Sequence, residues 1–206
     1  MSVTDKALLL KDDFDAVYEA GKKVGGGTTE PYAIYRGITS SGFAEVETVN
    51  MVSVSRGFMN GSNAGNTVKT LILNEGVRNL YQSSIYNCTS LTTVVLPSSL
   101  KQIFAYVFNA CTALNNIILP KSVTSIQNGA FQLCSGITNF DVEDGFNCNL
   151  PLNTCANISQ ESVSKIITHY KESSGKIFTV HADVFANIPE SEKTRAKNKG
   201  LSIASA

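Results

Sequence analysis

The feature that most constrains this chain is an internal repeat of 23 residues. Residues 68–90, 91–113 and 114–136 align with one another without insertions. Seven positions of each segment are apolar or cysteine, although only 43% of the chain is hydrophobic. The columns are Val68, Leu91 and Leu114; Leu71, Val94 and Ile117; Leu73, Leu96 and Leu119; Val77, Leu100 and Val123; Leu80, Ile103 and Ile126; Ile85, Phe108 and Phe131; and Cys88, Cys111 and Cys134. A period of this length predicts a repeat architecture in which each unit packs only on its neighbours.

One unit predicts the course of the backbone. Val94 and Leu96 point inward with the two-residue period of a strand. Pro97 ends that strand, because proline cannot donate to a ladder. The later apolar positions are irregularly spaced, as in a tight return arc. We therefore expect a right-handed stack of coils whose strands form a parallel sheet, with Val94 and Ile117 on adjacent strands.

The five cysteines are predicted to be free thiols. Cys88, Cys111 and Cys134 share one column, which predicts that they are buried, aligned and reduced. The odd count, in a chain that starts without an export signal, also argues against a disulfide framework.

The repeat pattern resembles a known family. Residues 119–137 (LPKSVTSIQNGAFQLCSGI) and 73–91 (LNEGVRNLYQSSIYNCTSL) resemble the BspA-type leucine-rich repeat, the second segment with Asn74 in place of proline and Ile85 in place of phenylalanine. The resemblance covers about 68–142. It implies an α/β repeat fold, a leucine-rich-repeat solenoid with a parallel β-sheet, and a role as an adhesion or recognition module.

The flanks predict caps at both ends of the solenoid. We divide the chain into an N-terminal attachment or oligomerisation helix (1–24), a glycine linker with a β-rich N-terminal cap (25–67), the leucine-rich repeats (68–158) and a C-terminal cap of helix, strand, helix and strand (159–206). Ser159 is the predicted N-cap of the first C-terminal helix. Phe178 and Val180 recur 23 residues later at Leu201 and Ile203, so the tail is predicted to add two strands to the same sheet, near 178 and 201.

The N-terminal helix carries apolar residues at coiled-coil spacing, among them Ala7, Leu10, Phe14 and Val17. This spacing predicts a homo-oligomer, with a trimer favoured, or docking into a groove of a partner. The alternative is that the helix folds back on its own N-terminal cap.

The sequence predicts no catalytic, cofactor or metal site, and therefore no enzyme. Its only histidines are His169 and His181, and no spacing brings either one to a cysteine. The repeating cysteines lack the paired spacing of zinc ligands. The acidic turn at 141–145 (DVEDG) is too short for an EF-hand calcium loop and is interpreted as a solvated turn.

Charge and hydropathy exclude two classes of partner. Lysine plus arginine and aspartate plus glutamate both number 17, so no net charge attracts nucleic acid. No stretch approaches the ~20 apolar residues of a membrane span, so no membrane insertion is expected. The opening lacks the apolar run and cleavage site of a signal peptide, which predicts synthesis for the bacterial cytoplasm.

The strand residues that face away from the core predict a binding face of short polar groups beside an aliphatic stripe. Its members are Thr70, Thr93, Asn116 and Asn139 in one row, and Ile72, Val95, Ile118 and Asp141 in the other. Exposed apolar rows often mark contacts. The equally weighted alternative is that the N-terminal cap or a neighbouring copy covers the stripe.

Two hypotheses for function follow. Residues 12–23 (DDFDAVYEAGKK) and 188–204 (IPESEKTRAKNKGLSIA) resemble the ends of tail- or baseplate-associated proteins of gut bacteriophages. With the helix–glycine–domain layout, this favours a non-enzymatic virion component whose partners are other virion proteins or a host receptor or glycan. The rival is a BspA-like adhesin on the bacterial cell surface, which would require a signal peptide and an anchor.

Overall fold

The computed structural model describes strands 33–39, 42–48, 53–54 and 59–60 together with residues 69–73, 76–172 and 175–206. The helix predicted over 1–24, including Ala7, Leu10, Phe14 and Val17, lies outside the described residues, as does the glycine linker. In the described part of the chain, no helix is both long and apolar enough to cross a membrane.

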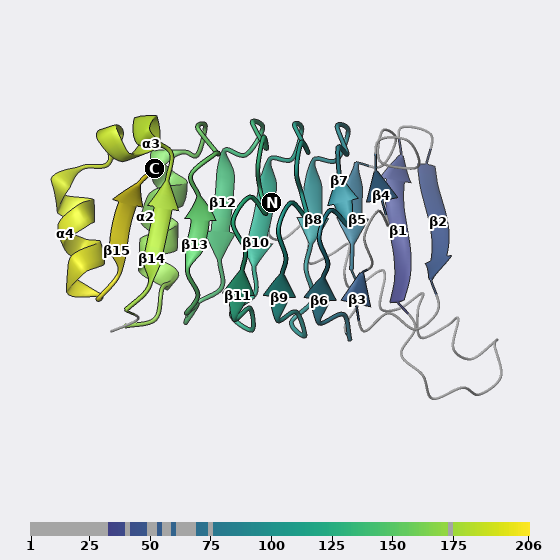
Figure 1. Ribbon diagram of the computed structural model, residues 1–206, viewed down its shortest axis with the longest axis horizontal. Coiled ribbons are helices and arrows are strands. Elements are labelled where there is room, and N and C mark those ends of the chain that lie inside the picture. Colours follow the sequence, from purple (N-terminus) through teal and green to yellow (C-terminus); the bar gives the residue numbers. More distant parts are fainter. Residues whose placement is uncertain are drawn as a thin grey trace.

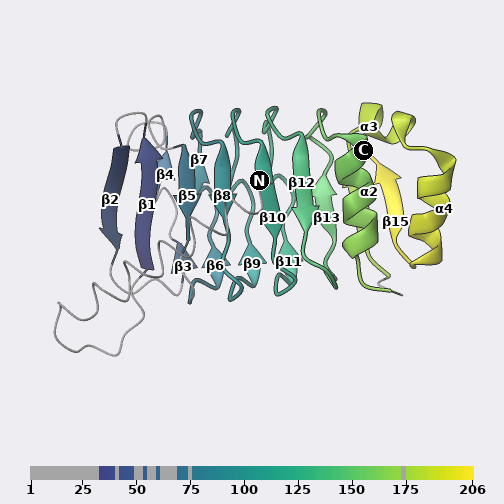
Figure 2. The ribbon, with the colours of Figure 1, turned by 180° about the vertical axis from the view of Figure 1, so that it is seen from behind.

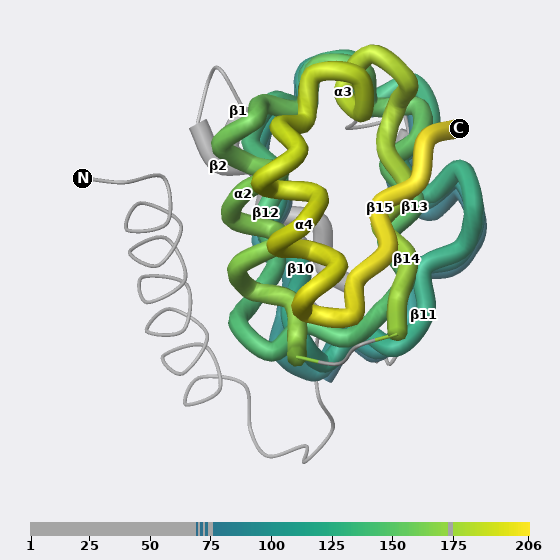
Figure 3. The backbone as a smooth tube through the Cα atoms, turned by 90° about the vertical axis from the view of Figure 1, so that its left-hand side faces the viewer, coloured from purple at the N-terminus to yellow at the C-terminus, as the bar shows by residue number. Residues whose placement is uncertain are grey.

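The repeat forms coils that stack along the long axis of the molecule (Figure 1), and the view down that axis shows each coil as a closed ring (Figure 3). Each coil gives one strand to a large parallel sheet. These strands are β5 (Thr70–Ile72), β8 (Thr93–Val95), β10 (Asn116–Leu119) and β12 (Asn139–Val142). Val94 pairs with Ile117, so the predicted register is confirmed. Parallel sheets repeated in this way make the fold an α/β repeat.

A second, smaller sheet runs along the opposite side of the stack (Figure 3). Its strands are β3 (Ser53–Val54), β6 (Asn79–Leu80), β9 (Gln102–Ile103) and β11 (Ser125–Ile126), all parallel. A separate pair of parallel strands consists of β4 (Met59–Asn60) and β7 (Ile85–Tyr86). Strands β3 and β4 therefore precede the repeat and pair with strands of its first coil.

An antiparallel hairpin extends the large sheet at its N-terminal end. It consists of β1 (Ala33–Thr39) and β2 (Gly42–Thr48), and β1 pairs antiparallel with β5. Figure 2 shows β1 beside β5 and β2 at the outer edge of the sheet.

The core consists of the predicted columns. Their described members are buried, except for Leu96 and Ile126, which are half-buried and pack against the core. The rings of Phe108 and Phe131 stack with centroids 5.4 Å apart, and Phe140 meets Phe131 edge-on at 5.4 Å. Aromatic pairs of this geometry add about 0.5–1.5 kcal/mol to the effect of burial alone.

All five cysteines are free and buried, as predicted for the aligned three. Cys134 Sγ donates to Phe108 O at 2.9 Å, and Cys111 Sγ donates to Ile85 O at 3.3 Å. Cys155 Sγ donates to Phe131 O at 3.6 Å and so adds a third thiol-to-carbonyl bond of this kind. The sequence alignment missed it because Cys155 lies two positions before the expected column.

Each coil turns through left-handed backbone at the same two positions. Ser83, Tyr106 and Gly129 occupy one column with φ of 54°, 59° and 75°. Asn87, Ala110 and Leu133 occupy the other with φ of 56°, 58° and 59°. Glycine or asparagine is usual at such angles. The turn geometry of the repeat therefore holds even where the side chain disfavours it.

The prediction that the tail adds strands to the large sheet is wrong. Strands β13 (Leu150–Leu152), β14 (Ile177–Val180) and β15 (Ser202–Ser205) form a separate parallel sheet. Phe178 pairs with Ile203, not with Leu201, so the tail has no 23-residue register. The physical reason is that α2 (Gln160–His169) packs against β12 where a further strand would pair (Figure 2).

The C-terminal helices close the last coils. Ser159 Oγ accepts from Ser162 N at 3.1 Å, which confirms the predicted N-cap of α2. The helix ends at His169, four residues before the Ser173 that was expected to end it. After β14 come α3 (Ala182–Asn187), which the sequence did not predict, and the expected polar helix α4 (Glu190–Asn198).

Candidate functional site

The candidate site is the outer face of the large sheet, seen from the front in Figure 2. The backbone register places all eight predicted face residues in two rows. Thr70, Thr93, Asn116 and Asn139 are successive partners in the first row, and the second row pairs Ile72 with Val95 and Ile118 with Asp141. The residues between them point inward, so alternation along each strand separates core from face. The side chains of Thr70 and Ile72 lie outside what the structure describes.

The described side chains of the two rows are accessible. Asn139 is exposed and Ile118 is 36% exposed, while Thr93, Val95 and Asn116 are half-buried. The hairpin of β1 and β2 continues the sheet sideways and does not lie across these side chains (Figure 2). The described face therefore presents amides and hydroxyls beside two aliphatic side chains.

The amides of this face are bonded to one another across coils. Asn139 Nδ2 donates to Asn115 Oδ1 at 3.1 Å and to Asn116 Oδ1 at 3.2 Å. Thr138 Oγ1 also donates to Asn115 Oδ1, at 2.8 Å. Side chains held in this way lose less conformational entropy when a ligand binds. Sequence reasoning missed Asn115 and Thr138 because it assumed strict alternation; the polar column that they share with Thr92 was the available signal.

A histidine–aspartate pair borders the face at its C-terminal end. His169 Nδ1 lies 2.8 Å from Asp141 Oδ1, which also accepts from Val142 N at 2.8 Å. The pair forms because the last turn of α2 lies beside β12. Among the described residues, no serine, threonine or cysteine side chain bonds to His169, so the pair lacks the nucleophile of a catalytic triad. Nothing in the sequence signalled this pairing across 28 residues.

The buried thiols are poor nucleophiles. Burial raises the pKa of Cys155 to about 12 and raises the pKa of Cys134 and Cys148 above the usual value of 9.0. A hydrogen bond with Cys111, together with burial, raises the pKa of Cys88. These groups remain protonated near neutral pH, whereas nucleophilic attack requires the thiolate. They act as packing groups.

The acidic turn makes contacts within the protein. Glu143 Oε2 accepts from Lys121 N at 3.1 Å, and Asp141 is engaged by His169. Within the described ranges, no group of three His, Cys, Asp or Glu residues is placed to hold a metal ion.

Comparison with known families identifies the repeat. Residues 61–150 match the BspA type leucine-rich repeat region in six copies, which confirms the resemblance predicted from residues 73–91 and 119–137. Repeats of this kind generally mediate protein interactions and are typically non-enzymatic. Searches of curated proteins and of solved structures found no match.

Proposed function

We propose that this chain is a non-enzymatic binding module that uses the outer face of the large sheet. The observation that supports this is the face itself: strands in register present Thr93 and the hydrogen-bonded amides of Asn116 and Asn139 beside Val95 and Ile118. Such a face can contact a partner through many short side chains without first ordering them. The partner would be a protein, or a glycan on a host surface.

The setting that we propose is a bacteriophage virion, at the tail or baseplate. The support is the likeness of residues 12–23 and 188–204 to the ends of such proteins and the helix–glycine–domain layout. Residues 1–24 would attach or trimerise the module, and the repeat would face outward. A bacterial surface adhesin is the alternative, favoured by the match of residues 61–150 to BspA type repeats.

Labelling of purified virions tests the setting. Antibodies raised against residues 69–206 are applied with gold to intact phage particles and, separately, to intact host bacteria. We expect gold at the tail or baseplate of the particles. Unlabelled particles together with labelled bacteria would replace the virion proposal with the adhesin.

Substitution of the face tests the binding role. Ile118→Lys places a long cation in the aliphatic row, and Leu133→Lys makes the same change on another side of a coil, where the side chain is 60% exposed. We expect the first variant to lose adsorption of the fluorescent protein to host cells or to virions that lack it, and the second to retain it. Equal adsorption by both variants would contradict use of this face. Light scattering of the intact chain, compared with one lacking residues 1–24, tests the proposed trimer.

A further inference from the structure

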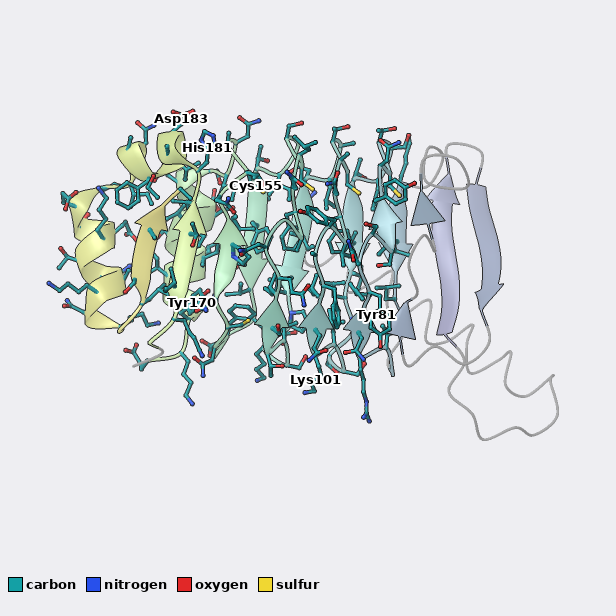
Figure 4. All side chains as sticks on the ribbon, in the orientation of Figure 1. Tyr81, Lys101, Cys155, Tyr170, His181 and Asp183 are labelled. Carbon is teal, nitrogen blue, oxygen red and sulfur yellow. The ribbon has the colours of Figure 1, made fainter. Side chains whose placement is uncertain are left out.

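The smaller sheet has an outer face of different chemistry, on the opposite side of the stack (Figure 3). Its register pairs Asn79 with Gln102 and Gln102 with Ser125, so residues 23 apart lie side by side. Two rows run along its border. Arg78 and Lys101 form a basic row that ends at Thr124, and Tyr81 and Phe104 form an aromatic row that ends at Gln127. Figure 4 labels Tyr81 and Lys101 near β6 and β9.

The basic row places two exposed cations on adjacent coils. Lys101 N donates to Arg78 O at 2.8 Å, so the two residues are neighbours on adjacent coils, and both side chains are exposed. No aspartate or glutamate occurs between Gly76 and Phe140, and neither cation forms an ion pair within the described residues. Like charges directly opposite one another destabilise a sheet. Two neighbouring exposed cations can together contact one anionic group from solution.

Two tyrosine side chains that follow these cations in the chain are accessible. Tyr81 is 42% exposed and Tyr106 is 40% exposed. The ring of Tyr81 packs against Phe104 with centroids 5.0 Å apart, which fixes its orientation. The ring of Tyr106 lies against Gly129, where an added Cβ would come within 2.7 Å of Cε1. Both rings are thus held by the protein on one side and open to solvent on the other.

Amide side chains complete the surroundings. Gln102 and Gln127 are exposed, and Gln127 Oε1 accepts from Ala105 N at 3.1 Å. That bond orients the amide and leaves its NH₂ group directed elsewhere. Rings, amides and cations together can contact a carbohydrate: the apolar face of a sugar packs on a ring, its hydroxyls bond to amides, and an acidic substituent meets a guanidinium or ammonium.

We propose that this face binds an acidic polysaccharide. The rings of Tyr81 and Tyr106 take the apolar faces of sugar residues, and Arg78 and Lys101 together take a carboxylate or sulfate. The single-stranded nucleic acids that also use rings and cations need a longer basic track than two residues. The proposal concerns a different face from the one proposed above for protein or host contact, so either can fail alone.

Calorimetric titration of the full chain tests it. The probes are an oligogalacturonate, which carries only carboxylates, a heparin oligosaccharide, which carries sulfates, neutral maltohexaose and oligo(dT). We expect binding of at least one acidic sugar, weakened at least tenfold in 0.5 M NaCl, and none of maltohexaose. The two acidic probes distinguish carboxylate from sulfate as the recognised group.

Matched variants locate the site. R78A/K101A and Y81A should each lower the affinity at least tenfold. Lys121→Ala, which removes an exposed cation outside the row, and Tyr86→Ala, which removes a 39% exposed ring on β7, should leave it within twofold. Because both side chains are exposed, R78A/K101A should melt within 2 °C of the wild type, which separates lost binding from misfolding. Absence of binding to both acidic probes, equal loss in the control variants, or tighter binding of oligo(dT) would overturn the proposal.

Discussion

Gly136→Ala tests how rigidly one coil packs on the next. A Cβ at Gly136 would lie 2.4 Å from Thr112 O, and 3.0 Å from both Ala113 C and Leu114 O, whereas ordinary contact begins at 3.4 Å. All three atoms belong to the backbone, so no side-chain rotation can relieve the clash. Either coil must move by about 1 Å, a shift comparable to those that make overpacked cores lose stability.

The backbone around Leu114 is held by core packing and by hydrogen bonds. Leu114 is fully buried and its N–H donates to Cys111 O at 3.0 Å, while Asn115 N donates to Thr92 O at 3.0 Å in the coil before. A shift would strain both coil-to-coil hydrogen bonds and core contacts. We therefore place the loss near the upper end of the range for overpacking, about 3 kcal/mol. For a chain of this size, that lowers the melting temperature by roughly 6–12 °C.

Gly145→Ala is the matched control. Gly145 has φ of +85°, but an added Cβ would meet nothing within 4 Å, so only backbone conformation is penalised. We expect it to cost about 1 kcal/mol. Both variants are measured by thermal melting and by urea unfolding followed by circular dichroism. If Gly136→Ala melts within 2 °C of the wild type, or is no less stable than Gly145→Ala, the coils are not rigid and the reasoning is wrong.

Three further predictions follow from single contacts. In urea unfolding, the free energy of unfolding of Leu133→Gly should be about 1 kcal/mol higher than that of Leu133→Ala. Both variants lose the exposed side chain, but only glycine relieves the strain of φ at 59°. Equal stability of the two variants would contradict this. Tyr170→Phe should lose about 1–2 kcal/mol in thermal melts, because it removes the 2.8 Å bond that Tyr170 Oη donates to buried Cys148 O. Burial raises the pKa of Cys155 from 9.0 to about 12 in the folded protein. Between pH 9 and 12 the thiol therefore ionises in the unfolded chain only, and the free energy of unfolding falls by about 1.4 kcal/mol per pH unit. Cys155→Ala should show a shallower decline in stability than the wild type when urea unfolding is measured from pH 8 to 10.

The repeat could be predicted because each column has one environment. Leu71, Val94, Ile117 and Phe140 are successive partners across four strands, so one period fixes both the register and the buried side. The columns of Phe108 and Cys111 were found in the same way, although no local propensity marks the arc that contains them. In a repeated structure, equivalent positions of each repeat share one environment, so the same kind of residue recurs at a fixed spacing in the sequence.

The tail could not be predicted because it does not repeat its pairing distance. Leu150 pairs with Phe178 and Phe178 with Ile203, at separations of 28 and 25 residues. The apparent 23-residue recurrence from Phe178 to Leu201 is a coincidence of apolar residues. Likewise, the bond of His169 to Asp141 depends on how α2 packs, and no local pattern records it.

The replacement of a strand by a helix after β12 explains both the seal of the core and the end of the candidate face. Helix α2 buries Val163, Ile166 and Ile167 and satisfies its own backbone, so it leaves no strand edge beside β12. Ser162 Oγ accepts from Phe140 N at 3.0 Å and donates to Thr138 O at 3.1 Å, in place of the ladder bonds of a further strand. The row of strand residues therefore ends at Asn139, and on the same strand Asp141 contacts His169 of α2. From Thr93 toward the C-terminus, a ligand on these rows would contact a hydroxyl, then neutral amides, and finally the Asp141–His169 pair. The two ends of the face therefore differ in chemistry, which favours one orientation of a bound ligand.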